Sequence, residues 1–142
     1  MKCFETTSAE ETKSLGTRIS GFLKPGDILA LIGELGSGKT TLIQGILKGL
    51  GFEGRVQSPS FIIVRTYNTD PEVKHVDLYR LEGKALEELH LEEIYSRAGI
   101  MIVEWADRSP WLPSGTSLIM IEFEAENGRK FRFEGPIEER MK

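Results

Sequence analysis

Residues 33–40, Gly33-Glu-Leu-Gly-Ser-Gly-Lys-Thr40, decide the fold, because they match the phosphate-binding pattern G-x-x-x-x-G-K-[ST] at every fixed position. The glycines carry no Cβ and reach positive φ, so the backbone can curl round a phosphate group; they are Gly33, Gly36 and Gly38. In this pattern Lys39 reaches the β- and γ-phosphates, and the Thr40 hydroxyl is placed to ligate Mg²⁺. The stretch predicts a site for a nucleoside triphosphate.

The flanking residues support this interpretation. Residues 27–33 are an apolar run typical of a buried parallel strand. Downstream, apolar residues recur at helical spacing between positions 42 and 50, and Gly51 marks the end of the helix. Strand, loop and helix in this order bring the positive end of the helix dipole to the phosphates. A plain glycine-rich turn would explain neither Lys39 nor Thr40.

Length and composition limit the possibilities further. A chain of 142 residues predicts a single domain over residues 1–142. A net charge of −4 and a pI near 5.3 argue against direct nucleic-acid binding. The start of the chain has no apolar leader-like region, and no stretch approaches the roughly 20 apolar residues of a membrane span, so we expect a cytoplasmic protein. Cys3 is the only cysteine, which excludes an internal disulfide.

A β-hairpin is predicted after the loop-helix unit. Residues 61–67 are β-branched and aromatic, and residues 73–80 alternate, with a Pro-containing turn between them. The alternation places His75, Asp77 and Tyr79 on one face. Two interpretations are open: a solvated strand face, or an arrangement in which Asp77 lies near the Mg²⁺ while His75 and Tyr79 position it or a nucleotide.

Residues 99–105 have the shape of a Walker B strand, in which four apolar residues end in the carboxylate of Glu104. A buried strand that ends at the same sheet edge as the loop would place this acid beside the phosphates. We favour a metal-binding or water-orienting role for Glu104 over a surface position, because a phosphate loop needs such an acid. Trp105 either covers the site or packs against the core, and we favour packing.

The remaining segments are assigned by periodicity and turn chemistry. Residues 1–6 predict a strand, and residues 9–24 predict a helix whose Ser8 and Glu11 have capping-box spacing. Residues 84–97 predict one acidic surface helix. Residues 117–126 and 129–134 predict a second hairpin, and residues 136–142 are expected to fray.

Taken together, the motifs resemble the TsaE (YjeE) family of small bacterial ATPases. The resemblance rests on four landmarks that follow in the family's order and spacing: Gly33-Glu-Leu-Gly-Ser-Gly-Lys-Thr-Thr41, Ser58-Pro-Ser-Phe61, His75-Val-Asp-Leu-Tyr-Arg-Leu81 and Val103-Glu-Trp105. The phosphate loop is shared by many families, whereas the His-x-Asp-Leu-Tyr-Arg-Leu run together with Glu-Trp is far more specific. Two positions depart from the family pattern, Glu34 and Ser60, and both keep a carboxylate or a hydroxyl.

The resemblance implies a role in making the threonylcarbamoyl modification of adenosine in tRNA. Such proteins hydrolyse ATP with Mg²⁺ alongside the TsaD and TsaB proteins, and meet tRNA only through these partners. It implies that Lys39, Asp77 and Glu104 are catalytic and that Thr40 and Glu104 serve the metal. The nucleotide-binding residues that it implies are Gly33, Gly36, Ser37, Gly38, Lys39, Thr40 and Thr41 at the triphosphate, with Thr7, Ser8 and Arg129 approaching the adenine and ribose.

We therefore expect a three-layer α/β P-loop fold with a mostly parallel sheet extended by antiparallel hairpins, and in-line attack of water on the γ-phosphate. Two other functions fit the motifs: a small-molecule kinase with Asp77 as base, and a nucleotide-gated binding module in which hydrolysis is incidental. An arginine that acts in the active site could come from a partner or from this chain. The candidates within this chain are Arg65, Arg80 and Arg108, and the sequence does not distinguish them.

Overall fold

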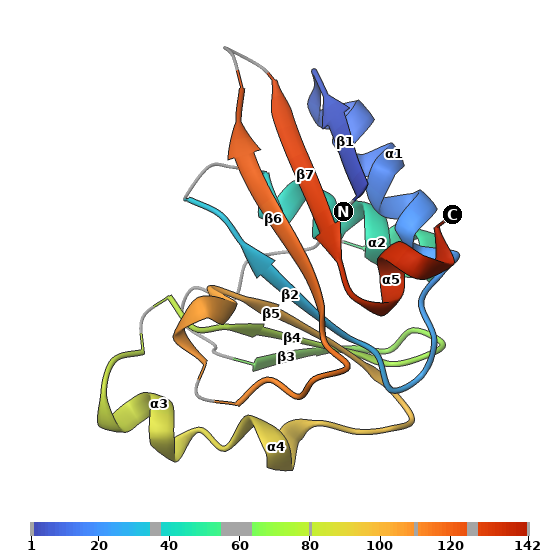
Figure 1. Ribbon diagram of the computed structural model, residues 1–142. Helices are drawn as coiled ribbons and strands as arrows, with labels where there is room; N and C mark the ends of the chain where they lie inside the picture. The colour runs from blue at the N-terminus through green and yellow to red at the C-terminus, as the bar shows by residue number, and fades with distance from the viewer. Residues whose placement is uncertain are drawn as a thin grey trace.

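The structure is a computed structural model that describes residues 2–34, 38–54, 64–79, 81–109, 111–124 and 128–141. Its seven strands form one sheet in the order β1-β7-β6-β2-β5-β4-β3 (Figure 1). The strands are β1 Lys2–Thr6, β2 Ile28–Ile32, β3 Val64–Tyr67, β4 Val73–Asp77, β5 Ile100–Glu104, β6 Ser117–Phe123 and β7 Arg129–Glu134. The helices are α1 Ala9–Ser20, α2 Lys39–Gly49, α3 Lys84–Glu88, α4 Leu91–Ile94 and α5 Pro136–Arg140, with a 3₁₀ turn η1 at Ala106–Arg108.

The centre of the sheet is parallel and its edges are antiparallel. Strand β2 pairs in parallel with both β5 and β6, and β5 pairs in parallel with β4. The β3–β4 and β6–β7 hairpins and the β1–β7 pair are antiparallel. This arrangement confirms the predicted fold, and it brings the carboxyl ends of β2, β4 and β5 to one edge.

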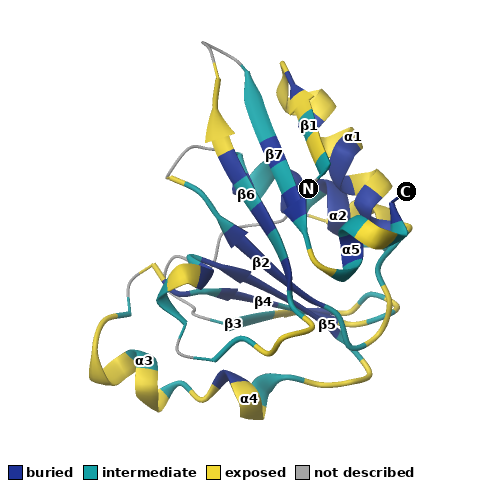
Figure 2. Cartoon of the chain, viewed as in Figure 1, coloured by how far each residue is buried: buried dark blue, intermediate teal, exposed yellow. Residues whose placement is uncertain are grey.

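Both faces of the central strands are covered. Leu29 and Leu31 of β2 join a core with α1, α2 and α5, while Ile28 and Ala30 join a second core with α4 and η1. Figure 1 shows α1, α2 and α5 gathered on one face of the sheet, and Figure 2 shows β2 and β5 as mostly buried strands between the layers. The sheet is therefore the middle of three layers.

Glycines let α1 and α2 touch closely. A Cβ on Gly16 would collide with the Leu42 carbonyl oxygen, and a Cβ on Gly45 would collide with the Lys13 carbonyl oxygen. Because side chains are excluded at this crossing, the backbone of α2 is held directly against α1. The crossing fixes the helix that begins at the phosphate loop.

Two predicted elements are shorter than expected. Helix α1 ends at Ser20, where Gly21 caps it, and not near residue 24. Strand β4 ends at Asp77, so Tyr79 lies beyond the strand. Residues 61–63, the expected start of the first strand of the β3–β4 hairpin, lie outside the described residues, and so does Asn127 of the expected Asn-Gly turn.

The acidic segment is two short helices, so the prediction of one helix over residues 84–97 was wrong. The chain breaks at His90, whose φ of 51° lies in the left-handed region. This turn directs Leu91 into the core, where it is 4% exposed. Burial of an apolar side chain therefore outweighs continuous helical hydrogen bonding here.

Residues 136–141 pack against the rest of the chain, so the expectation that they fray was also wrong, whereas Lys142 lies outside the described residues. Ile137 of α5 is fully buried, and Met141 is 5% exposed. Arg140 donates two hydrogen bonds to the Asp27 carboxylate, at 2.6 and 3.0 Å, which ties α5 to the start of β2. Within the described segments, no helix is long and apolar enough to cross a membrane.

Candidate functional site

The phosphate loop runs from the end of β2 to the start of α2, at the carboxyl edge of the parallel strands. Gly38 precedes α2 with a φ of 106°, a conformation that glycine adopts at no steric cost. The first turn of α2 carries the half-buried Thr40 and Thr41. Gly33 and Gly38 are described, whereas Gly36 and Ser37 lie outside the described residues.

Lys39 is buried and folds back over the loop. Its Nζ donates to the carbonyl oxygen of Gly33, and the carbonyl oxygen of Glu34 lies 3.4 Å away. The side chain of Trp105 covers the ammonium, whose nitrogen lies 4.1 Å from the ring centroid. A cation at this distance from an indole face is stabilised by the ring quadrupole.

Burial lowers the pKa of the Lys39 ammonium below its ordinary value of 10.5. Three carboxylates oppose this shift: those of Glu104, Asp77 and Asp107. Burial disfavours a charge, and opposite charges nearby favour it. Lys39 is thus a partly desolvated cation surrounded by acids at the sheet edge.

Glu104 and Asp77 are the acids of this edge. They occupy paired positions at the ends of the parallel strands β5 and β4. Glu104 is 3% exposed, and its Oε2 lies 2.6 Å from the Nε2 of His75. Asp77 is half-buried, and its Oδ1 accepts a hydrogen bond of 2.9 Å from the Tyr79 backbone N–H. The solvated-face interpretation is wrong for His75, which is fully buried.

The donor chemistry of this edge fits Mg²⁺. The Thr40 hydroxyl and the two carboxylates are hard oxygen ligands, which Mg²⁺ prefers. The described part of the chain holds no group of three or more His, Cys, Asp or Glu arranged to hold a metal by themselves. Proteins usually bind Mg²⁺ through one or two of their own oxygens, with phosphate oxygens and water as the other ligands.

Arg129 lies beside the loop, although it is distant in the sequence. A Cβ placed on Gly38 would be 3.9 Å from its Nε. The guanidinium packs 4.2 Å from the centroid of the Phe123 ring. Arg129 also pairs with Thr6 in the β1–β7 register, so Thr7 and Ser8 follow at the same edge. The structure therefore gathers Gly38, Arg129 and the Thr7–Ser8 turn.

Thr7 and Ser8 are held by the start of α1. The Ser8 hydroxyl accepts from the Glu11 backbone N–H at 3.1 Å. The Glu11 carboxylate accepts from the backbone N–H and the hydroxyl of Thr7, at 2.7 and 2.9 Å. The predicted capping pair thus exists, with its return bond directed to Thr7.

Trp105 lies over Lys39, as one of the two interpretations of this residue predicts, whereas its contacts with Tyr79 and Arg108 were not predicted. Trp105, in the left-handed region at a φ of 57°, packs on Tyr79 with ring centroids 4.9 Å apart. Arg108 donates to the Tyr79 carbonyl at 2.8 Å and lies over the Tyr79 ring. Trp105 packs as expected and also contacts the loop lysine; its place directly after Glu104 was the available signal.

Of the other two candidate arginines, the structure describes only Arg65. Arg80 lies outside the described residues. Arg65 of β3 stands opposite His75 in the β3–β4 register.

A known protein family matches most of this chain. The family model described as "Threonylcarbamoyl adenosine biosynthesis protein TsaE" matches residues 6–131. Similar proteins named "tRNA threonylcarbamoyladenosine biosynthesis protein TsaE" include one from Bacillus subtilis, 38% identical over 92% of this chain and 83% of that protein. Another, from Treponema pallidum, is 30% identical over 92% of this chain and 97% of that protein.

A solved structure is similar as well. The crystal structure of YdiB from Bacillus subtilis superposes with a TM-score of 0.79 and 33% identity, over 93% of this chain and 83% of that chain. The family match spans the phosphate loop, the two acids and Arg129. The chain belongs to the TsaE family.

Proposed function

We propose that this protein is the ATP-hydrolysing component of the machinery that makes N6-threonylcarbamoyladenosine in tRNA, and that it acts with the TsaD and TsaB proteins. The names of its relatives support the pathway. The observation that carries the hydrolytic role is the placement of Lys39 at the start of α2, within the electrostatic reach of Glu104 and Asp77.

The loop and the helix bind the phosphates. Backbone N–H groups at the start of α2 face the anion, and the helix dipole favours negative charge there. The Lys39 ammonium leaves the Gly33 and Glu34 carbonyls to contact the β- and γ-phosphates, where it neutralises developing charge. A lysine that is already buried at the loop has little solvent to lose on binding.

Glu104 and Asp77 position the metal and the attacking water. When bound, Mg²⁺ would supply positive charge that offsets the negative charge of the phosphates. Thr40 and Glu104 would bind this metal ion. Asp77 and Glu104 orient the attacking water in line with the bond to the leaving group, and no acceptor hydroxyl is required. On the other side of the loop, Arg129 and the Thr7–Ser8 turn approach the adenine and ribose.

The acidic surface supports an indirect contact with tRNA. A net charge of −4 disfavours binding to a phosphate backbone. TsaD and TsaB therefore provide the contact with tRNA, and this protein provides ATP hydrolysis for the cycle.

The test is release of free phosphate from ATP and Mg²⁺ by the purified protein, alone and with TsaD and TsaB, with Lys39→Ala as the control. We expect weak release alone, a several-fold rise with the partners, and none from the variant. Phosphate found on an acceptor would indicate a kinase. Nucleotide-dependent partner binding without any release would indicate a binding module.

A further inference from the structure

The bond between His75 and Glu104 joins two side chains that are both removed from solvent. His75 is fully buried, Glu104 is 3% exposed, and Nε2 lies 2.6 Å from Oε2. A carboxylate oxygen only accepts, so the imidazole presents an N–H at Nε2. A buried carboxylate is costly without such a donor, so this bond stabilises Glu104 where it lies.

The second ring nitrogen of His75, Nδ1, makes no hydrogen bond within the described part of the chain. Most buried side-chain polar atoms have a hydrogen-bond partner, so a buried nitrogen without one needs an explanation. Among the described residues, the imidazole of His75 forms its hydrogen bond with one atom, the Oε2 of Glu104.

Packing fixes the plane of the ring. His75 lies in β4 between β3 and β5, opposite Arg65 on one side and Ile102 on the other. Its ring stacks on Tyr67, with centroids 6.5 Å apart and an interplanar angle of 27°. Tyr67 is 4% exposed and is therefore itself held by the core.

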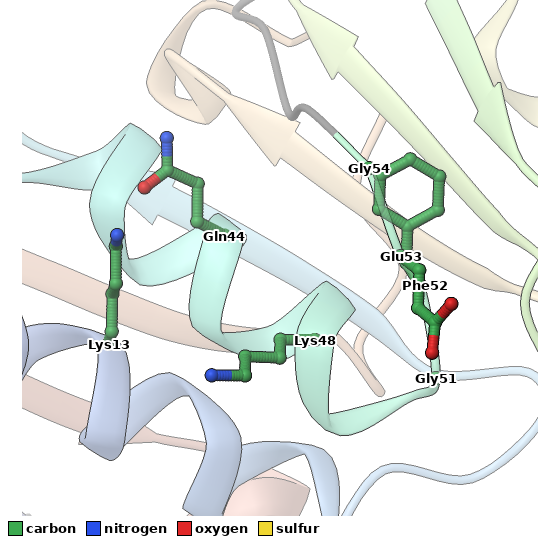
Figure 3. A pocket seen from close by; sticks show the side chains of 7 residues that line it. All are labelled: Lys13, Gln44, Lys48, Gly51, Phe52, Glu53 and Gly54. Carbon is green, nitrogen blue, oxygen red and sulfur yellow. The ribbon is translucent and has the colours of Figure 1, made fainter.

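A second aromatic ring, that of Phe52, packs against Tyr67 from the surface. The Phe52 ring meets Tyr67 edge-on, with centroids 4.9 Å apart and an interplanar angle of 81°. Phe52 also lines a hollow of about 630 Å³ beside the end of α2 (Figure 3). The column Phe52–Tyr67–His75 thus runs from this hollow to the carboxylate at the sheet edge.

We propose that His75 is a positioning residue for Glu104: its Nε2–H holds the carboxylate in the orientation needed for hydrolysis, and the column of Phe52 and Tyr67 holds the imidazole. This inference rests on the proposed function. His75 does not touch the nucleotide, so its loss slows turnover while nucleotide affinity is kept. Partners that orient an essential carboxylate are typically worth ten- to a hundredfold in activity.

A matched pair of variants isolates the bond. In His75→Gln the amide nitrogen takes the place of Nε2, and in His75→Asn it takes the place of Nδ1. Both side chains are polar and uncharged, so they differ mainly in whether a donor reaches Glu104. Phosphate release at saturating ATP and the Kd of a fluorescent ATP analogue are measured for both, with thermal unfolding to confirm folding.

We expect His75→Asn to lower the rate by about tenfold or more, with the Kd within about twofold, and His75→Gln to retain most of the rate. Equal rates for both variants and the wild type would overturn the positioning role. Equal losses in both would also overturn it, because the donor at Nε2 would then not be what matters. If the wild type itself releases no phosphate, the proposed function fails, and the hydrolytic part of this inference fails with it.

The bond can be tested apart from activity by proton NMR of the nucleotide-free protein. A buried imidazole N–H bonded to a carboxylate gives a far-downfield, slowly exchanging signal, and the only other histidine, His90, is exposed. We expect this signal in the wild type and an upfield shift in Glu104→Gln, which removes the negative charge. A signal unchanged by that substitution, or absent from the wild type, would overturn the pairing even if ATP is hydrolysed.

Discussion

Asp77 and Glu104 are direct partners across the parallel strands β4 and β5, and each is the last residue of its strand. On the other side of β5, Glu104 is paired with Leu31 of β2, two residues before Gly33. The register therefore sets both acids beside the root of the phosphate loop. Parallel strands with aligned ends are what bring these groups together.

Removal of either Lys39 or Glu104 should abolish turnover. Lys39→Ala deletes the cation that neutralises phosphate charge, and Glu104→Ala deletes the acid of the metal side. We expect phosphate release to fall by about a hundredfold or more in each variant. Glu104→Ala turning over ATP at the wild-type rate would show that the Walker B assignment is wrong.

Asp77→Asn should separate chemistry from binding. The amide keeps the size of the side chain and can still accept from Tyr79, but it lacks the charge that orients water or supports the metal. We expect kcat to fall by about a hundredfold and the ATP Kd to change little. A normal kcat with a raised Kd would assign Asp77 to binding alone.

Arg129→Ala should weaken ATP binding several-fold with a smaller effect on kcat, because Arg129 lies beside Gly38 on β7, which β6 and β2 separate from the strand of Glu104. Arg132→Ala on the same strand is the matched control. Arg132 is 3.6 Å from Glu122 in a solvent-exposed pair, which contributes little. Titration of a fluorescent ATP analogue measures both, and similar affinities for the two variants would remove Arg129 from the site.

The stability that the start of α1 gives to the fold should depend on pH. Hydrogen bonds from the backbone and the hydroxyl of Thr7 lower the pKa of Glu11 below its ordinary value of 4.5. Ionised Glu11 therefore stabilises the fold fully at a pH above 4.5, its ordinary pKa. This stabilisation is lost as the pH falls through the pKa of Glu11 in the folded protein, which is lower. Wild type should have a higher Tm than Glu11→Gln at neutral pH, and the difference should close in acid.

Glu10→Gln is the control for this pH dependence, because it removes the same charge from the same helical turn. A Tm difference between wild type and Glu11→Gln that stays constant from neutral pH into acid would contradict the assignment.

The docked C-terminal helix predicts a stability effect. Ile137 is fully buried, so Ile137→Ala should lower the free energy of unfolding by about 2–5 kcal/mol in urea. Glu139→Ala, at an exposed position of the same helix, should change it by less than about 0.5 kcal/mol. Equal small effects would mean that α5 does not contribute to the core.

Much of the fold could be predicted from local patterns. The glycine loop lies between a buried strand and an amphipathic helix, and Glu104 ends an apolar run; both signals lie within a few residues. The alternation in β4 placed His75 and Asp77 on one face, although it left their environment open. Periodicity and turn chemistry act over such short distances.

Contacts between distant segments could not be predicted in this way. The pairing of His75 with Glu104 and the approach of Arg129 to Gly38 depend on strand order and register. His90 breaks the acidic helix because Leu91 is needed in the core, and α5 is ordered because Ile137 and Arg140 find partners in other elements. Each outcome is decided by tertiary packing and not by local propensity.

The most direct measurement follows free phosphate and modified tRNA together in one reaction containing ATP, Mg²⁺, TsaD, TsaB, the threonylcarbamoyl donor and tRNA, with wild-type protein or Lys39→Ala. We predict that wild type releases phosphate and sustains repeated rounds of modification, and that Lys39→Ala supports neither. Repeated modification at an unchanged rate with Lys39→Ala, or without this protein, would contradict the account.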